Sequence, residues 1–409
     1  MNCRHCKTFL SDVFIDLVNA PPSNSFLVEE DLVRPEIFYP LKVFVCRNCW
    51  LVQTDEMKSS SEIFNSEYAY YSSYSSTWIE HSRRFAEMIC DRLSLNGNSQ
   101  VIEIASNDGY LLQFFKAKGI PCFGVEPAGG AADVARSKGI ETIGDFFGRM
   151  LSSKFAEKGI IADLIVGNNV LAHTPDINDF VAGLPGILSP SGTVTMEFPH
   201  LLRLIENSQF DTIYHEHFSY LSLTAVSRIF MSFGLEIYDV EELTTHGGSL
   251  RIYARHAKIS KSPPGSKVGS IISMEKKFGL FDLAVYYEFQ KKANKIKYDF
   301  LDFLTEAAIG GKKIIGYGAA AKGNTLLNYC GVKKDMISFV VDASPAKQGK
   351  FLPGSHIPVV AENEIKKFQP DFVIIFPWNI SEEIMSQIEY IREWGGKFVI
   401  TIPKLKICG

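Results

Sequence analysis

The chain has 409 residues, with 42 Lys or Arg against 46 Asp or Glu, and its formal net charge is −4. With 46% hydrophobic and 22% charged residues, its composition is that of an ordinary globular protein, which excludes a largely disordered chain. The near-neutral balance offers no broad surface for nucleic acid. The length predicts two or three domains. Because no run of 18 apolar residues and no apolar leader is present, we expect no membrane partner and a cytoplasmic location, where thiols stay reduced.

Four of the eight cysteines form two C-x-x-C pairs, Cys3 with Cys6 and Cys46 with Cys49. Each pair presents two thiolates to one ion, and two pairs complete a tetrahedral set of sulfurs that suits zinc. Because four sulfurs leave no open coordination position, the metal would be structural. A redox dithiol is the alternative, but it is expected beside a βαβ pattern. We therefore predict a zinc-binding domain at residues 1–62, with a looped insert, poor in strands, between the pairs.

Residues 64–78 are rich in tyrosine and serine. The run is a poor helix and is too polar for a buried strand. It is either a surface connector with aromatic anchors or a flap that folds over a ligand, and in the second case Tyr71 and Ser72 would contact the substrate. A helix with apolar positions at helical spacing is predicted to follow over about residues 76–93.

Strands and helices alternate along residues 63–256, which we assign to a central domain. This alternation predicts a mostly parallel, doubly wound sheet, and ligands of such sheets bind at the carboxyl ends of the strands. An antiparallel pair joined by the turn at 245–248 would complete the sheet. The predicted strands are 101–104, 122–126, 163–167, 193–198, 235–243 and 249–255, with helices near 109–118, 129–138 and 224–233.

The loop after the first strand of this domain runs from Glu103 to Gly109 and opens a helix. Its backbone N–H groups therefore point into the crevice, but it lacks the glycines of a pyrophosphate cradle. Glu126 ends the second strand, where a carboxylate accepts hydrogen bonds from ribose hydroxyls. A ligand with a ribose and no phosphate fits this pattern, and S-adenosylmethionine is the candidate. The predicted cofactor residues are Glu103, Ser106, Asn107, Asp108, Gly109, Glu126, Asp145, Phe146, Asn168, Asn169 and His173.

The densest cluster of proton-transfer groups lies at residues 214–222, which begin Y-H-E-H. In an extended segment Tyr214 and Glu216 would face one way and His217 the other, although a bend would change this. His217 can act as a general base near neutral pH if a carboxylate orients it. Metal binding is the competing interpretation, but the segment does not match the H-E-x-x-H pattern on a helix. A structural histidine is the simpler alternative for any single member, whereas the whole cluster favours catalysis.

A second, smaller Rossmann-like domain is predicted at residues 306–409, after a helical connector at 257–305. A strand leads into G-x-G-x-x-A and then into Lys322, which is a dinucleotide-type fingerprint, and a later strand ends in Asp342. The backbone can approach a pyrophosphate there, with Lys322 as a point charge. From these residues, NAD(P) and a nucleotide-sugar diphosphate remain equal alternatives. The predicted substrate residues of this domain are Gly316, Gly318, Ala321, Lys322, Asn324 and Asp342.

Together these motifs resemble the nucleotide-sugar C-methyltransferases of deoxysugar pathways, which methylate C3 of 4-keto hexoses. The resemblance covers nearly the whole chain and is carried by the two C-x-x-C pairs, E-I-A-S-N-D-G, N-N-V-L-A-H, T-I-Y-H-E-H-F-S-Y-L-S and G-Y-G-A-A-A-K-G-N-T. It implies structural zinc, S-adenosylmethionine in the middle domain, and a nucleotide-diphosphate sugar rather than NAD in the C-terminal domain. It also implies that Tyr214, Glu216 and His217 are catalytic, with His217 as the base.

We therefore expect an α/β protein with a small N-terminal zinc-binding segment, a central class I (Rossmann-like) methyltransferase domain and a smaller C-terminal Rossmann-like domain. The expected activity is removal of the C3 proton from an NDP-4-keto-deoxysugar and methylation of the enolate by a monomeric enzyme. The rival hypotheses are a nicotinamide-dependent oxidoreductase or epimerase that uses the C-terminal fingerprint, and a catalytically silent protein with two nucleotide-binding domains.

Overall fold

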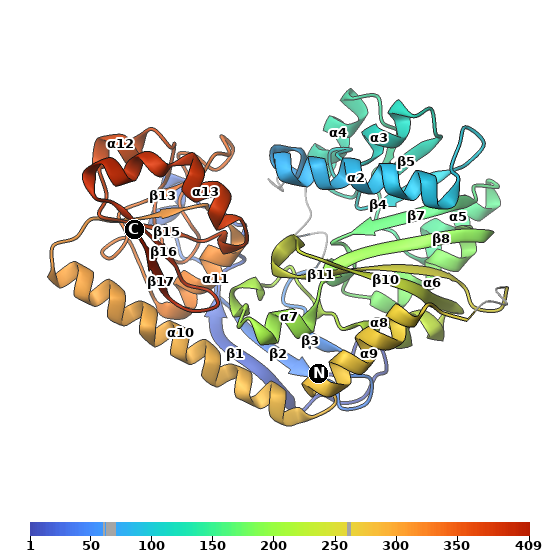
Figure 1. Cartoon of the computed structure of the whole chain (residues 1–409), viewed down its shortest axis with the longest axis horizontal. Coiled ribbons are helices and arrows are strands. Elements are labelled where there is room, and N and C mark those ends of the chain that lie inside the picture. Colours follow the sequence, from blue (N-terminus) through green and yellow to red (C-terminus); the bar gives the residue numbers. More distant parts are fainter. Residues whose placement is uncertain (60–61, 63–70, 260–262) are drawn as a thin grey trace. The chain divides into compact units, whose positions relative to one another are not determined.

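The computed structural model describes residues 1–59, 62, 71–259 and 263–409. The chain forms two compact units, and neither is continuous in sequence (Figure 1). Each unit is built around its own sheet with helices, which confirms the mixed α/β class. The first unit comprises Met1–Leu10, Cys46–Leu201 and Phe218–Phe281, and the second comprises Ser11–Val45, Leu202–His217 and Asp282–Gly409.

The main sheet of the first unit has seven strands in the order β10-β11-β8-β7-β4-β5-β6. The last five strands of that order pair in parallel, whereas β11 is antiparallel to both of its neighbours. The predicted doubly wound sheet, completed by an antiparallel pair, is therefore confirmed. The strands are β4 (Val101–Ile104), β5 (Cys122–Val125), β6 (Thr142–Ile143), β7 (Ala162–Asn168), β8 (Leu188–Pro199), β10 (Leu235–Leu243) and β11 (Ser249–His256).

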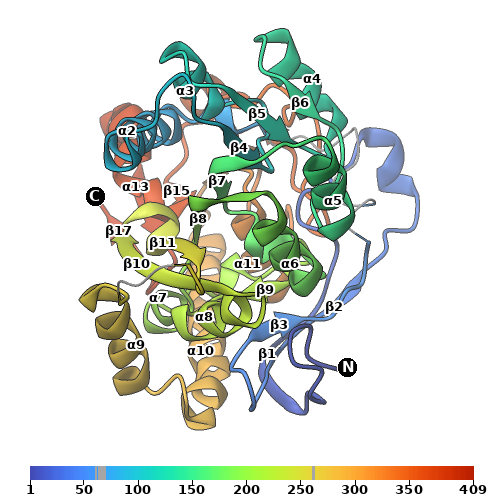
Figure 2. The ribbon, with the colours of Figure 1, turned by 90° about the vertical axis from the view of Figure 1, so that its right-hand side faces the viewer.

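Helices cover both faces of this sheet. Figure 2 shows α2 (Ser76–Leu93) and α3 (Leu112–Ala117) on one face, with α5 (Arg149–Glu157) and α6 (Ile177–Ile187) on the other. Phe85 and Ile89 of α2 are four residues apart and therefore lie on one face of the helix. That face is buried against the sheet. The remaining helices of the unit are α4 (Gly129–Ser137), α8 (Leu223–Ser232) and α9 (Ser266–Phe278).

The helix predicted from Gly109 starts only at Leu112, so its first turn was placed wrongly. Asn107 and Gly109 both adopt positive φ, at 47° and 77°, and an α-helix cannot include residues in that conformation. The backbone between β4 and α3 is therefore a loop at the carboxyl edge of the sheet. Its N–H groups do not all point into an open crevice as expected, because those of Ala105 and Ser106 donate to the Val125 carbonyl and that of Gly109 donates to the Ser106 carbonyl.

The segment between the two cysteine pairs contains two strands, β1 (Asp12–Ala20) and β2 (Tyr39–Val45), which pair antiparallel within the second unit. The expectation of a strand-poor insert was therefore wrong for these residues. Their apolar side chains have a partner that the local sequence does not reveal. Phe14 stacks on Phe289 of α10 (Leu283–Ile309), with 4.6 Å between ring centroids. In the first unit, β3 (Val52–Thr54) pairs antiparallel with β9 (Ser219–Tyr220).

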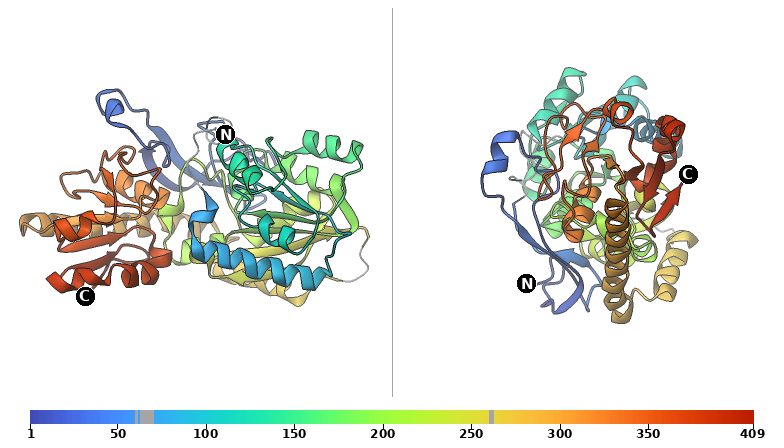
Figure 3. Two further views of the ribbon diagram at one scale, coloured as in Figure 1. Left: turned by 90° about the horizontal axis from the view of Figure 1, so that it is seen from above. Right: turned by 90° about the vertical axis from the view of Figure 1, so that its left-hand side faces the viewer.

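The second unit contains a six-stranded sheet in the order β14-β13-β12-β15-β16-β17, parallel except for β17. Figure 3 shows the long helix α10 beside this sheet. The strands are β12 (Ile314–Tyr317), β13 (Val340–Val341), β14 (Val359–Val360), β15 (Phe372–Ile375), β16 (Lys397–Ile400) and β17 (Lys406–Cys408). The other helices are α7 (Leu201–Glu206), which starts at the end of the first unit, α11 (Ala321–Cys330), α12 (Glu364–Phe368) and α13 (Ser381–Gln387).

Short 3-10 segments connect many of these elements. They are η1 (Glu29–Val33), η2 (Ser72–Tyr74), η3 (Leu171–His173), η4 (Phe210–Thr212), η5 (Thr245–Gly247), η6 (Trp378–Ile380) and η7 (Glu389–Trp394). No helix within the described ranges is both long and apolar enough to cross a membrane.

Candidate functional site

The predicted cofactor residues meet at the carboxyl edge of the seven-stranded sheet. The backbone N–H of Asn107 donates to the Glu126 carboxylate at 2.9 Å, and Asn168 lies in register with Glu197 of β8. The loop after β4 packs tightly on β5, because a Cβ added at Gly124 would lie 2.1 Å from Ser106 Oγ. Residues that are distant in the sequence therefore share one edge of the sheet.

Several residues at this edge have strained backbone. Ala105, Asn107, Asn169 and His246 all have positive φ, between 47° and 58°. L-amino acids rarely adopt this region, and such residues concentrate at functional sites. Asn169 and His246 also contact each other, with 3.1 Å between Nδ2 and Nε2. The strain thus marks a site that spans the ends of β4 and β7 and the turn before β11.

Polar atoms are buried at this edge without protein partners. Ser106 Oγ, Asp108 Oδ1 and Asn169 Oδ1 form no hydrogen bond within the part of the chain that the structure describes. An unsatisfied buried polar atom is costly, so it marks a place where a polar ligand would bind. The set fits the ribose and amino-acid portions of S-adenosylmethionine, which can donate to such atoms.

Acidic groups also concentrate here. Burial, together with the neighbouring carboxylates of Glu126 and Asp108, raises the pKa of Glu103 well above its usual value. Burial likewise raises the pKa of Glu126, although the N–H groups of Ala128 and Asn107 oppose this effect. A cationic ligand would relieve this repulsion, and S-adenosylmethionine carries both a sulfonium and an ammonium group.

The other predicted residues of the first unit lie around the same edge. Asp145 accepts a hydrogen bond from the N–H of Phe146, whose side chain is 43% exposed after β6. His173 ends η3. Ser72, next to Tyr71, donates its N–H to Asn107 Oδ1 at 2.9 Å, which places this pair beside the predicted cofactor loop. The hypothesis of a flap at residues 68–74 lies partly outside the described residues.

Sequence reasoning missed the polar network at the end of β8. Glu197 is fully buried and accepts hydrogen bonds from His81 Nε2, Arg251 Nη2 and Thr245 Oγ1 at 2.8–2.9 Å. Burial alone would raise the pKa of Glu197, but the His81 hydrogen bond and the Arg251 charge lower it to about 2. Through Thr245, this charged residue holds the turn that carries His246. The sequence signal at this place is T-H-G-G, which by itself indicates a plain turn.

Removing the Glu126 carboxylate tests the cofactor assignment. We expect Glu126→Ala to weaken binding of S-adenosylmethionine by about 1.5–3 kcal/mol, the range for a hydrogen bond to a charged group. Titration calorimetry measures the change. Glu141→Ala, at an exposed position just before β6, is the matched control and should leave the affinity unaltered. If the Glu126→Ala protein binds with normal affinity, the ribose is held elsewhere.

The two predicted cysteine pairs come together within the first unit. The sulfurs of Cys3, Cys6, Cys46 and Cys49 all lie within 4.8 Å of one another. The two pairs have matching turns. The N–H of Lys7 donates to the carbonyl of Cys3, and in the same way the N–H of Trp50 donates to the carbonyl of Cys46. Lys7 and Trp50 also share a positive φ, of 62° and 63°. This paired geometry and the all-sulfur donor set fit a tetrahedral zinc ion.

The Y-H-E-H segment lies in the second unit and is not extended. The N–H of His217 donates to the carbonyl of Tyr214 at 3.0 Å, which closes a turn, and the rings of these two residues lie 4.0 Å apart. The expectation for an extended segment, with Tyr214 and His217 on opposite sides, was therefore wrong. The turn brings a phenol and an imidazole together instead.

A hydrogen bond determines the orientation and tautomer of His217. Its Nδ1 donates to the carbonyl of Thr212 at 2.8 Å, so the proton sits on Nδ1 and Nε2 carries the lone pair of the neutral ring. Sequence analysis expected a carboxylate to orient the ring, whereas the bond found here comes from the backbone. His215 instead donates Nε2 to the carbonyl of Pro40 at 3.2 Å, which is a structural role.

The predicted fingerprint of the second unit surrounds the carboxyl ends of β12 and β15. A Cβ at Gly316 would lie 2.5 Å from Phe376, and one at Gly318, where φ is 87°, would lie 2.4 Å from Pro377. Both glycines are therefore required by the packing of this unit itself. Asp342 accepts the N–H of Ala319, two residues before the Ala321 of the fingerprint, at 2.7 Å.

Lys322 lies in a cluster that sequence analysis missed. Its Nζ donates to Asn379 Oδ1 at 2.6 Å and lies 4.3 Å from the ring centroid of Trp378. The Trp378 Nε1–H donates to buried Asp211 at 2.7 Å. Burial lowers the pKa of Lys322 to about 8, opposed by Asp211, and burial raises the pKa of Asp211 to about 6, opposed by Lys322. The cluster places the Lys322 cation in the elements that follow the carboxyl ends of β12 and β15. Asn324, by contrast, donates its amide to the Ser23 carbonyl.

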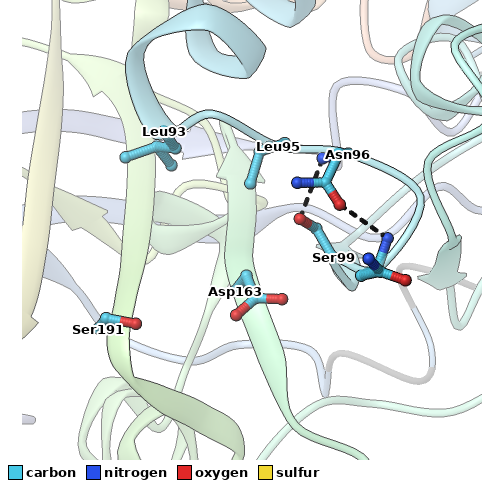
Figure 4. A pocket seen from close by; sticks show the side chains of 7 residues that line it. Leu93, Leu95, Asn96, Ser99, Asp163 and Ser191 are labelled. Atoms are coloured by element: carbon cyan, nitrogen blue, oxygen red, sulfur yellow. Dashed lines mark hydrogen bonds between the residues drawn. The ribbon is translucent and has the colours of Figure 1, made fainter.

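A small polar pocket lies at the opposite, amino-terminal edge of the seven-stranded sheet (Figure 4). Its acid, Asp163, already accepts hydrogen bonds from the Gln100 N–H and the Ser189 hydroxyl. This pocket therefore has a structural explanation and lies away from the predicted residues.

Comparisons with known proteins agree with the fold and with the four-cysteine cluster. Three family models match: a "putative zinc binding domain" at residues 3–64, a methyltransferase domain at 78–240 and a C-methyltransferase C-terminal domain at 244–403. The C-methyltransferase NovU of Streptomyces niveus is 33% identical over 405 residues, which cover 98% of this chain and 96% of NovU.

Solved structures of methyltransferases each cover less than half of the chain. The CcbJ methyltransferase of Streptomyces caelestis covers 43% of this chain and 89% of its own, with 13% identity and a TM-score of 0.34. Magnesium protoporphyrin IX methyltransferase of Synechocystis covers 43% and 81%, with 14% identity and a TM-score of 0.34.

Proposed function

Because the chain belongs to the sugar C-methyltransferase family and is an S-adenosylmethionine-dependent methyltransferase, we propose that it methylates C3 of a nucleotide-diphosphate 4-keto-deoxysugar in deoxysugar biosynthesis. The observation that carries the proposal is the turn in which Tyr214 and His217 meet, with the His217 proton held on Nδ1. This arrangement supplies a base and a hydrogen-bond donor at neighbouring positions. Both are needed to form an enolate.

The proposed chemistry follows from the substrate. The 4-keto group acidifies the C3 proton, and the lone pair on His217 Nε2 accepts that proton. The Tyr214 phenol stabilises the negative charge that develops on O4, where a preorganised donor has its largest effect. Bound S-adenosylmethionine would supply the electrophilic methyl group, and the enolate carbon forms the new C–C bond. Glu126, Asp108 and Asn169 would hold this cofactor in the first unit.

The four cysteines would hold a zinc ion with no part in the chemistry, because a closed set of sulfurs leaves no position for substrate. Thiolate ligands require reducing conditions, which supports a cytoplasmic location for the enzyme.

Methyl transfer itself provides the direct test. The protein is incubated with labelled S-adenosylmethionine and a set of 4-keto-6-deoxyhexoses carried on dTDP, GDP or CDP. Label is expected in one of the sugars at C3, located by NMR. Calorimetry with NAD(P) is run alongside. Tight NAD(P) binding without label transfer to any sugar would favour the oxidoreductase hypothesis. Binding of S-adenosylmethionine and of a sugar nucleotide without any reaction would favour a silent binding protein.

Lys322 predicts a pH dependence of diphosphate binding. A cation whose pKa is lowered to about 8 loses its charge as the pH rises through 8, so affinity for a nucleoside diphosphate should be full at pH 7. We expect the affinity to be about tenfold weaker at pH 9.5, the lower end for a lost charged hydrogen bond. Titrations with dTDP and GDP at both pH values measure this. Lys322→Arg should remove the pH dependence, and Lys322→Ala should raise the substrate KM while leaving cofactor affinity intact.

The exposed Lys333 provides the control for this experiment, because Lys333→Ala removes one charge from the same unit. If the decline above pH 8 persists in Lys322→Arg, another group binds the diphosphate.

A further inference from the structure

A segment near the start of the second unit contacts the predicted catalytic turn, which comprises residues 214–217. Asn24 Nδ2 donates to both carboxylate oxygens of Glu216, at 2.7 and 2.9 Å. Glu216 is buried, so these bonds take over part of the solvation that an ionised carboxylate requires. The two residues are 192 positions apart, and sequence analysis identified only Glu216.

The chain around Asn24 is held in place on both sides. On one side, Asn324 of α11 donates its amide to the Ser23 carbonyl at 2.6 Å, and both of these residues are buried. On the other side, Leu27 and Phe351 exchange backbone hydrogen bonds of 3.0 and 2.8 Å. Asn24 therefore lies on a braced segment, and its amide is presented to Glu216 in a defined position.

The catalytic turn is held by the same helix. Thr325, the residue after Asn324 in α11, donates its hydroxyl to the Ile213 carbonyl at 2.9 Å. Two adjacent residues of α11 thus hold the two segments that meet. Asn324 holds Ser23, next to Asn24, and Thr325 holds Ile213, at the start of the turn that carries Glu216. A contact built on one rigid element is more precise than one between two independent loops.

We propose that Asn24 is a positioning residue for the methyl-transfer reaction, which keeps the carboxylate of Glu216 ionised and oriented next to His217. The inference rests on the proposed function, since it assumes that His217 is the base. Hydrogen bonds to the charged form of a carboxyl favour that form. An ionised Glu216, the residue before His217 in the same turn, then stabilises through its charge the imidazolium that forms when His217 takes the C3 proton, while Nδ1 keeps its hydrogen bond to the Thr212 carbonyl.

Two substitutions of Asn24 test this role. Asn24→Ala removes the donor, and Asn24→Asp keeps the shape but sets a second carboxyl against Glu216. We expect kcat for methyl transfer to fall roughly 10- to 100-fold in both, the size of effect produced by a misplaced catalytic group, with the KM for the sugar within about threefold of normal. The rate should also fall more steeply on the acidic side of the pH profile, more so for Asn24→Asp, because Glu216 without its amide donors is protonated more easily, in addition to the protonation of His217.

The controls separate positioning from folding. Asn19→Asp and Asn19→Ala make the same changes at an exposed position of β1 and should behave as the parent enzyme. Titration with dTDP and GDP shows whether each variant still binds its nucleotide. The other ionisable side chains around this segment are those of Asp211, His215, His217 and Lys322, and they are unaltered in every variant.

The outcomes are distinct for the two claims. If the parent enzyme transfers methyl groups while both Asn24 variants keep its kcat and pH profile, the positioning role is wrong and the proposed function stands. A parent enzyme that methylates none of the sugars overturns the proposed function and this inference with it. If the isosteric Asn24→Asp protein loses both its nucleotide binding and its activity, Asn24 has a structural role and the proposal is wrong.

Discussion

His217→Asn is expected to abolish methyl transfer while both ligands still bind. The substituted side chain retains a polar group but has no basic nitrogen with which to accept the C3 proton. Loss of a general base typically lowers a rate by about 10²- to 10⁴-fold. The measurement is twofold: transfer of label from S-adenosylmethionine, and exchange of the C3 proton with deuterated water. The exchange reports the proton step without any methyl donor.

Two neighbouring residues provide matched controls for His217. His215→Asn should be milder, because His215 donates to the carbonyl of Pro40 and has no expected role in the proton step. Tyr214→Phe should slow the reaction and still permit exchange if its phenol only stabilises the enolate. If His217→Asn exchanges the C3 proton at a near-normal rate, the base is another group, and His173 in the first unit is the next to test.

Cys46→Ser is expected to cost more in folding than in chemistry. One zinc per chain should be bound by the four cysteines, and losing one thiolate removes a large share of a binding energy of about 10–16 kcal/mol, which in small zinc domains is also folding energy. We expect elemental analysis to show zinc near one equivalent in the parent protein and strongly reduced zinc in the variant. Thermal unfolding of the variant should occur at lower temperature.

Cys122→Ser is the control for the metal site, because Cys122 lies on β5 and outside the sulfur cluster. It should keep a full complement of zinc. Less than about half an equivalent of zinc in freshly purified parent protein would count against the metal assignment, whatever the behaviour of the variants.

Local patterns were enough to predict several parts of the site. A C-x-x-C turn presents two thiolates wherever it occurs, so both cysteine pairs were found without knowledge of the fold. Alternation of strands and helices implies a parallel sheet, and the carboxyl ends of parallel strands lie on one edge. This is why Glu103, Glu126 and Asn168 were predicted together and lie together.

Other features depended on backbone conformation that the residue pattern does not specify. An alternating arrangement was expected for Tyr214 and His217, but a single backbone hydrogen bond closes a turn and reverses the geometry. The helix after β4 starts late because Asn107 adopts positive φ, which asparagine tolerates but does not require.

The sequence by itself determined the class of the fold, the two cysteine pairs, the edge of the sheet where the predicted cofactor residues lie and the Y-H-E-H cluster, because each depends on neighbours within one element or on strand order. Only the tertiary structure decided that Asn24 meets Glu216, that Trp378 holds Asp211 beside Lys322, and that Phe14 makes a strand of a segment expected to be a loop. Those contacts join residues more than 160 positions apart. Their formation depends on how whole elements pack, and no spacing in the sequence records that packing.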